Sequence, residues 1–198
     1  MTSFGKRALG VCLGLGWLAL AGCEDANWRG TDISETMPPL DFELVSESGT
    51  RINEGDVAGD TVLVYFGFTH CPDVCPTALA RLSAALRELD ETVREDVTVL
   101  FVSVDPERDT PEVLKAYTEA FGPRFVGVTG DKAALDEVTN RYRVSYRLGE
   151  PEADGSYDVD HSSAIFAFDA GGDARLLMRD SDSVEAIAAD IRRLAQQG

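Results

Sequence analysis

Residues 66–76 read FGFTHCPDVCP, and this segment lies between two patterned stretches that decide the fold. Before it, Thr61 to Phe68 is a nearly continuous run of β-branched and aromatic residues, which predicts a central strand buried on both faces. A strand that leads into a helix puts the segment at the carboxyl end of the strand, where open α/β sheets bind ligands. The helix is predicted from leucines that recur at the spacing of one apolar face: Leu79, Leu82, Leu86 and Leu89.

Two cysteines in this segment, Cys71 and Cys75, each directly precede a proline. A residue before proline is biased away from helical backbone angles, so we expect a loop here and a helix whose first residue is Pro76. On a regular helix, residues four apart have Cβ atoms about 5–6 Å apart, whereas a disulfide needs about 3.5–4.5 Å. The loop therefore leaves the two sulfurs free to bond to each other or to a metal.

The position of the pair predicts a reactive dithiol. A helix N-terminus favours the thiolate form of a nearby cysteine. The chain has two histidines, His70 next to Cys71 and His161 in the segment VDHSS at residues 159–163. Two sulfurs with an imidazole suit copper in either oxidation state, and also zinc. Asp160 is a candidate to orient His161.

Further along the chain, strands alternate with helices and a β-hairpin precedes the last helix. Thr110 and Pro111 make a good helix start, and that helix is expected to bury Val113, Leu114 and Tyr117. The element order predicts an α/β fold: a thioredoxin-like mixed sheet flanked by helices, with extra N-terminal strands. The expected strands are 41–45, 97–104, 125–128, 164–168 and 175–178, and the expected helices run from 110 to about 122, from 131 to about 141, and from 183 to 195.

The N-terminus has the pattern of a secretory signal. Lys6 and Arg7 precede an apolar run over residues 8–20, which is too short for a typical membrane-spanning helix. The following Leu-Ala-Gly-Cys, ending at Cys23, resembles the bacterial lipoprotein cleavage box. We therefore expect a signal peptide over 1–22, a tether over 23–39 that carries lipid on Cys23, and a domain over 40–198. The alternative is plain secretion with a free Cys23.

The charge of the chain excludes one class of partner, and its cysteine content leaves a single pair of thiols for function. With 18 Lys and Arg against 35 Asp and Glu, the formal net charge is -17, which excludes nucleic acid as a partner. Of four cysteines, Cys12 leaves with the signal and Cys23 is used by the anchor. Only Cys71 and Cys75 remain as thiols, and export puts them in an oxidising compartment, where they form a disulfide or hold a metal.

Three segments together resemble the Sco/SenC family: residues 65–76, the run DPERDTP at residues 105–111, and Asp-His-Ser at residues 160–162. The resemblance implies a thioredoxin-like copper chaperone that serves the dinuclear copper centre of cytochrome c oxidase. It implies one copper ion bound by Cys71, Cys75 and His161. His70 matches a variable family position and is interpreted as an exposed neighbour that tunes the Cys71 thiol. For residues 105–111 we expect a turn and a helix cap, with Arg108 paired to an acid.

The resemblance leaves two functions open. One is a metallochaperone, a binding protein without catalytic turnover that meets the copper-receiving subunit of the oxidase on the periplasmic side of a bacterial envelope membrane. The other is a thiol–disulfide reductase that keeps the oxidase cysteines reduced, which needs only the two thiols. His161 favours the chaperone, because exchange chemistry has no essential use for it.

A further partner would be another periplasmic copper chaperone or a thiol reductant.

Other functions rank lower. No match to the threonine-supported cysteine of peroxiredoxins is found. A purely structural Cys71–Cys75 bridge would close so few residues that it would be a weak staple. A buried structural role for His161 stays open.

Overall fold

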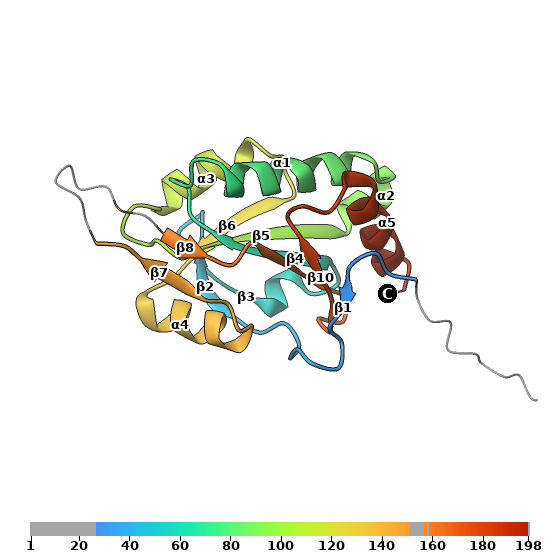
Figure 1. Cartoon of the computed structure of the whole chain (residues 1–198), viewed down its shortest axis with the longest axis horizontal. Helices are drawn as coiled ribbons and strands as arrows, with labels where there is room; N and C mark the ends of the chain where they lie inside the picture. Colours follow the sequence, from blue (N-terminus) through green and yellow to red (C-terminus); the bar gives the residue numbers. More distant parts are fainter. Residues whose placement is uncertain (1–26, 151–156, 158, 198) are drawn as a thin grey trace, which may run out of the picture.

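The computed structural model of the chain describes residues 27–150, 157 and 159–197 (Figure 1). Its centre is an eight-stranded sheet in the order β1-β10-β9-β4-β5-β6-β2-β3. β4 pairs in parallel with β5, and β5 with β6, while the other neighbours pair antiparallel. The strands of this sheet are β1 Thr31–Asp32, β2 Glu43–Ser46, β3 Arg51–Asn53, β4 Thr61–Gly67, β5 Val97–Ser103, β6 Phe125–Thr129, β9 Ala164–Phe168 and β10 Ala174–Arg179.

Helices cover both faces of the sheet, with α1 and α3 on one side and α4 on the other (Figure 1). A separate two-stranded sheet pairs β7, Tyr146–Leu148, with β8, Val159–His161. The helices are η1 Glu54–Val57, a 3₁₀ turn, and α1 Val74–Arg87, α2 Glu91–Glu95, α3 Pro111–Glu119, α4 Lys132–Arg141 and α5 Val184–Ala195. This mixed sheet flanked by helices confirms the predicted fold class.

The two central strands are buried along their whole length. Every residue of β4 and β5 is buried, as the β-branched and aromatic run predicts for a strand covered on both faces. The four leucines of the predicted apolar face, Leu79, Leu82, Leu86 and Leu89, are at most 4% exposed. α1 is therefore held against the sheet by its apolar face, and this contact sets where its N-terminus lies.

Two local expectations were wrong. α1 begins at Val74 and not at Pro76, because Pro76 lies in the first turn, where a helix needs no backbone N–H donor. Cys75 is therefore in the helix, while Cys71 precedes it. Val113 is 37% exposed and does not pack inward, because successive helical residues are rotated by about 100° and the inward position belongs to Leu114.

The described part of the expected tether packs on the domain. The backbone N–H groups of Arg29 and Gly30 donate to the Asp190 carboxylate, β1 pairs with β10, and Ile33 is buried. The boundary at residues 39 and 40 stays a prediction, while the signal segment and Cys23 lie outside the described residues. Within residues 27–150 and 159–197, no helix is both long enough and apolar enough to cross a membrane.

Candidate metal site

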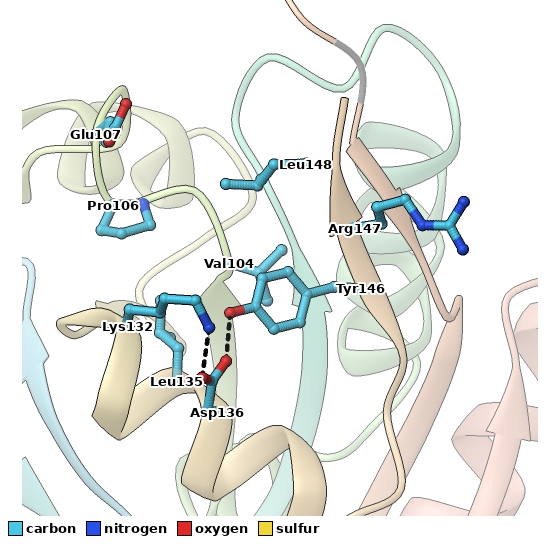
Figure 2. Close-up of a pocket in the computed structure, with 9 residues that line it drawn as sticks. All are labelled: Val104, Pro106, Glu107, Lys132, Leu135, Asp136, Tyr146, Arg147 and Leu148. Atoms are coloured by element: carbon cyan, nitrogen blue, oxygen red, sulfur yellow. Dashed lines mark hydrogen bonds and ion pairs between the residues drawn. The ribbon is translucent and has the colours of Figure 1, made fainter. Parts of the chain in front are cut away.

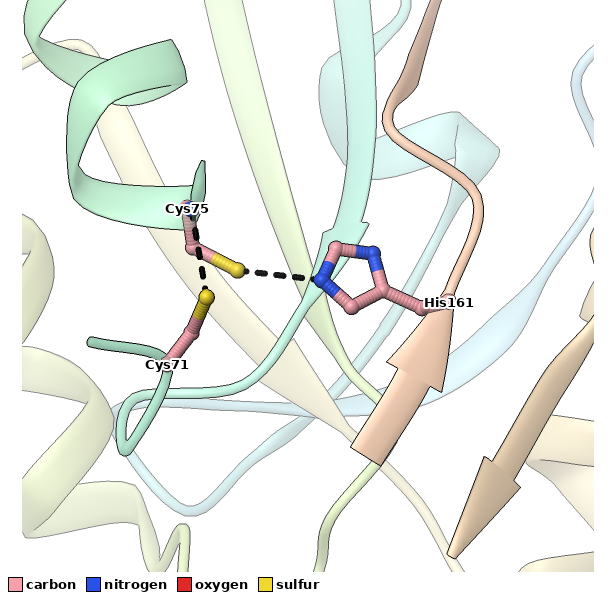
Figure 3. A group of neighbouring side chains, drawn as sticks. All are labelled: Cys71, Cys75 and His161. Carbon is pink, nitrogen blue, oxygen red and sulfur yellow. Dashed lines mark hydrogen bonds between the residues drawn. The ribbon is translucent and has the colours of Figure 1, made fainter. Parts of the chain in front are cut away.

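The two cysteines lie on either side of the start of α1. Cys71 is half-buried in the loop after β4, and Cys75 is fully buried in the first helical turn. The backbone N–H of Cys75 donates to Cys71 Sγ across 3.3 Å (Figure 3). Both thiols are free, so the loop holds the sulfurs near each other without a covalent bond.

His161 reaches the cysteines from the end of β8. Its Nε2 lies 3.2 Å from Cys75 Sγ, and the ligand atoms of Cys71, Cys75 and His161 all lie within 4.8 Å of one another (Figure 3). Two segments that are far apart in sequence, the cysteine loop with the start of α1 and the end of β8, therefore place two sulfurs and one imidazole nitrogen around a single point.

The backbone carbonyl of Ser162 decides which ring nitrogen of His161 is available. His161 Nδ1 lies 2.9 Å from that oxygen, and a carbonyl oxygen only accepts, so Nδ1 carries the proton and donates. Nε2 then has a free lone pair directed at the sulfurs. Asp160, predicted to orient the ring, is exposed instead, because successive residues of a strand point to opposite sides.

Two aromatic rings pack edge-on against the imidazole. The ring centroids of Tyr65 and Phe68 lie 6.0 and 5.8 Å from that of His161, at interplanar angles of 90° and 84°. Edge-to-face contacts of this kind are favourable and directional. They restrict the orientation of the imidazole plane.

The chain is similar in sequence to known proteins over most of its length. The family model for SCO1/SenC matches residues 34–196. The chain belongs to the SCO1/SenC family. The mitochondrial SCO1 homolog of Homo sapiens is 41% identical over 133 residues, which is 67% of this chain and 44% of that protein. A SCO2-like protein of Rickettsia felis is 40% identical over 133 residues, 67% of this chain and 64% of its own. The alignments thus span less than two thirds of these relatives.

Solved structures of the family resemble the whole described domain. Bradyrhizobium japonicum ScoI with copper bound has a TM-score of 0.71 and 36% identity, covering 79% of this chain and 98% of that one. A SCO1/SenC family lipoprotein from Bacillus anthracis has a TM-score of 0.66 and 25% identity, covering 85% and 99%. The described domain therefore shares the thioredoxin-like fold of these Sco proteins.

Burial dominates the protonation of Cys75 in this SCO1/SenC protein. Removal from water raises the pKa of the Cys75 thiol to about 12. The expectation that the helix N-terminus would favour its thiolate is therefore wrong for Cys75. The Cys75 thiol therefore keeps its proton and donates it in the hydrogen bond to Nε2 of His161. A metal that binds here must displace that proton.

His70 lies at the edge of the group. Its side chain is 52% exposed, and its Nδ1 is 3.2 Å from Thr69 Oγ1 and 3.6 Å from an oxygen of Asp109. It does not belong to the group formed by the two cysteines and His161 among the described residues. This position agrees with the interpretation of His70 as an exposed neighbour of Cys71.

Residues 105–111 form the predicted turn and cap. Arg108 Nε donates to Asp105 across 2.5 Å, and Thr110 Oγ1 caps α3 by accepting from the backbone N–H of Val113. Sequence reasoning did not predict that Asp109, within this segment, accepts from Thr69 Oγ1, or that Arg108 donates to the backbone carbonyl of Tyr157. The partners in these two contacts lie 40 and 49 residues apart, so the spacing of residues in the sequence does not reveal them.

A separate hollow of about 360 Å³ lies between α4 and β7 (Figure 2). Tyr146 donates from its hydroxyl to Asp136, which also pairs with Lys132. None of the cysteines and histidines of the candidate site lines this hollow, and three of its polar side chains, Lys132, Asp136 and Tyr146, are paired with one another.

Proposed function

We propose that this protein binds one copper ion through Cys71 Sγ, Cys75 Sγ and His161 Nε2 and carries it to a respiratory cytochrome oxidase. The convergence of these three ligand atoms within 4.8 Å carries the proposal. Metal bonds of about 2.0–2.3 Å require the ligands of one ion to lie at most about 4.6 Å apart, so a small adjustment suffices. The copper bound by Bradyrhizobium japonicum ScoI supports copper as the metal.

The donor set favours copper over zinc. Soft thiolates select Cu(I), and imidazole suits copper in either state. Structural zinc sites take four ligands, whereas the described residues bring three to this point. Copper here is cargo, and a site with few ligands can release its metal to a receiving protein.

A thiol–disulfide reductase is the second candidate, and one observation favours it. Cys71 is half-buried while Cys75 is fully buried, as expected of an attacking thiol and a resolving thiol. The Cys71 thiolate would attack an oxidase disulfide, and Cys75 would then displace the bound sulfur. The products are a Cys71–Cys75 disulfide and two oxidase thiols, with the two electrons supplied by this protein.

Mixing experiments with the copper-receiving domain of an oxidase separate the two functions. We expect the copper-loaded protein to transfer its metal to that domain when the domain is already reduced, as followed by its dinuclear copper absorption. Copper that stays on this protein contradicts delivery. Reduction of the receiving domain's disulfide by the copper-free protein, without copper transfer in any arm, supports the reductase instead.

We also propose that residues 1–22 are removed, that Cys23 is lipidated, and that the domain sits on the periplasmic side of an envelope membrane. The Leu-Ala-Gly-Cys sequence supports this, as does the Bacillus anthracis family lipoprotein. Cys23→Ser is expected to release the protein from washed membranes, detected by immunoblot of the fractions. Full retention on the membranes would contradict lipid anchoring through Cys23.

A further inference from the structure

The segment from Asp105 to Asp109 supplies no ligand atom to the proposed copper site. It nevertheless contacts both the loop that carries Cys71 and the chain that leads to His161. It begins two residues after the end of β5, and both aspartates are 0% exposed. Burying a carboxylate is costly unless donors satisfy it, so the partners of these two side chains indicate what they hold in place.

Asp109 holds the cysteine loop. It accepts from the backbone N–H of Thr69 across 2.8 Å and from Thr69 Oγ1 across 2.6 Å. It also accepts from Ser103 Oγ, at the end of β5, across 2.5 Å. Thr69 is two residues before Cys71, so this carboxylate binds the cysteine loop to the central sheet.

Asp105 holds the segment that leads to His161. It accepts from the Tyr157 hydroxyl and from Arg108 Nε. The Arg108 guanidinium lies 3.6 Å from the centroid of the Tyr157 ring and donates to the Tyr157 carbonyl across 3.2 Å. Tyr157 is four residues before His161, so these contacts anchor the chain close to His161 in sequence.

The same carboxylates lie near His70, and the ligand atoms of His70, Asp105 and Asp109 are within 4.8 Å of one another. Each carboxylate oxygen already accepts a hydrogen bond from Thr69, Ser103, Tyr157 or Arg108. The observed partners therefore make this cluster a hydrogen-bonded brace.

We propose that Asp105 and Asp109 are positioning residues that set the distance between the cysteine sulfurs and the His161 imidazole. Asp109 fixes the cysteine side and Asp105, through Arg108 and Tyr157, fixes the histidine side. The inference rests on the proposed copper site. Metal sites need their ligands held within about 0.5 Å, which mobile loops do not achieve without such supports.

The test uses two variants that each remove one hydroxyl contact of the brace at a position that is not fully buried. Thr69→Val removes the hydroxyl that Asp109 accepts from, and Tyr157→Phe removes the one that Asp105 accepts from. Thr69→Ser keeps the hydroxyl and should restore the wild-type behaviour. The matched control is Thr98→Val, which removes a hydroxyl bond to Asp60 near the opposite end of β5.

Copper affinity is measured by competition with a chelator, together with the thiolate-to-copper absorption of the Cu(II) form. Loss of a group that orients a metal ligand typically weakens binding by about 10–100-fold, and we expect this for Thr69→Val and for Tyr157→Phe, with a shifted absorption band. Thr98→Val and Thr69→Ser should bind as wild type. Equal affinity and an identical band in all four variants would overturn the proposal.

Hydrogen exchange on the copper-free proteins keeps this inference separate from the copper assignment. Thr69→Val should speed amide exchange at residues 69–71, and Tyr157→Phe should speed it at residues 159–161, with no such change in Thr98→Val. If the wild type binds no copper, the proposed function fails, and these exchange rates alone decide whether the brace exists. Unchanged exchange in both variants would overturn it.

Discussion

His161→Ala is expected to weaken copper binding by more than a hundredfold while the domain stays folded. Loss of a group that merely orients a ligand typically costs about 10–100-fold, and this substitution removes the ligand itself. His161 is half-buried, and its strand is held by backbone pairing with Tyr146, so the fold does not depend on the imidazole. Chelator competition gives the affinity, and circular dichroism confirms the fold.

The other histidine of the chain supplies the matched control. His70 is exposed and adjacent to Cys71, but it lies outside the group of ligand atoms. His70→Ala should keep copper affinity within a few-fold of wild type. Equal losses in the two variants, or no loss in His161→Ala, would show that the imidazole of His161 is not a ligand.

Gly67→Ala is expected to destabilise the domain and to displace Cys75. A Cβ at position 67 would lie 2.8 Å from Phe101 Cε2 and 2.9 Å from Cys75 Sγ, closer than such contacts allow. Both neighbours are 0% exposed, so neither has room to move. Overpacking of this kind costs about 1–3 kcal/mol, whereas replacing a strand glycine by alanine without a clash gains about 0.5–1 kcal/mol. Denaturant unfolding of both proteins measures whether the free energy of unfolding falls, as the clash predicts, or rises.

The same substitution should weaken copper binding, because Cys75 Sγ is pushed from its place beside His161 Nε2. Gly171→Ala, in the turn between β9 and β10, is the control, since its Cβ would meet only Asp169 Oδ1, at 3.3 Å. A Gly67→Ala protein as stable as wild type, with unchanged copper affinity, would mean that Cys75 is less tightly confined than the distances indicate.

The central elements were predictable because their patterns are local. The β-branched run of β4 and the leucine spacing of α1 are each contained in one short stretch of sequence, and the structure agrees with both. The meeting of Cys71, Cys75 and His161 was predicted from the family resemblance, and the structure brings these residues together. Their role as metal ligands stays a proposal.

What the sequence did not reveal depends on contacts between distant segments. β7 and β8 have three residues each and form a sheet only by pairing with each other, so neither has a local pattern long enough to detect. The high pKa of Cys75 follows from burial, which is a property of the packed domain and outweighs the helix N-terminus. The contacts of Asp109 with Thr69, forty residues apart, are likewise invisible in spacing.

X-ray absorption at the copper edge of the reduced, copper-loaded protein tests the central claim most directly, because it identifies the atoms bonded to the metal. The proposed site predicts one copper per chain with two sulfur ligands and one imidazole nitrogen, supplied by Cys71, Cys75 and His161. Copper surrounded by oxygen and nitrogen atoms alone, or by a single sulfur, would contradict it.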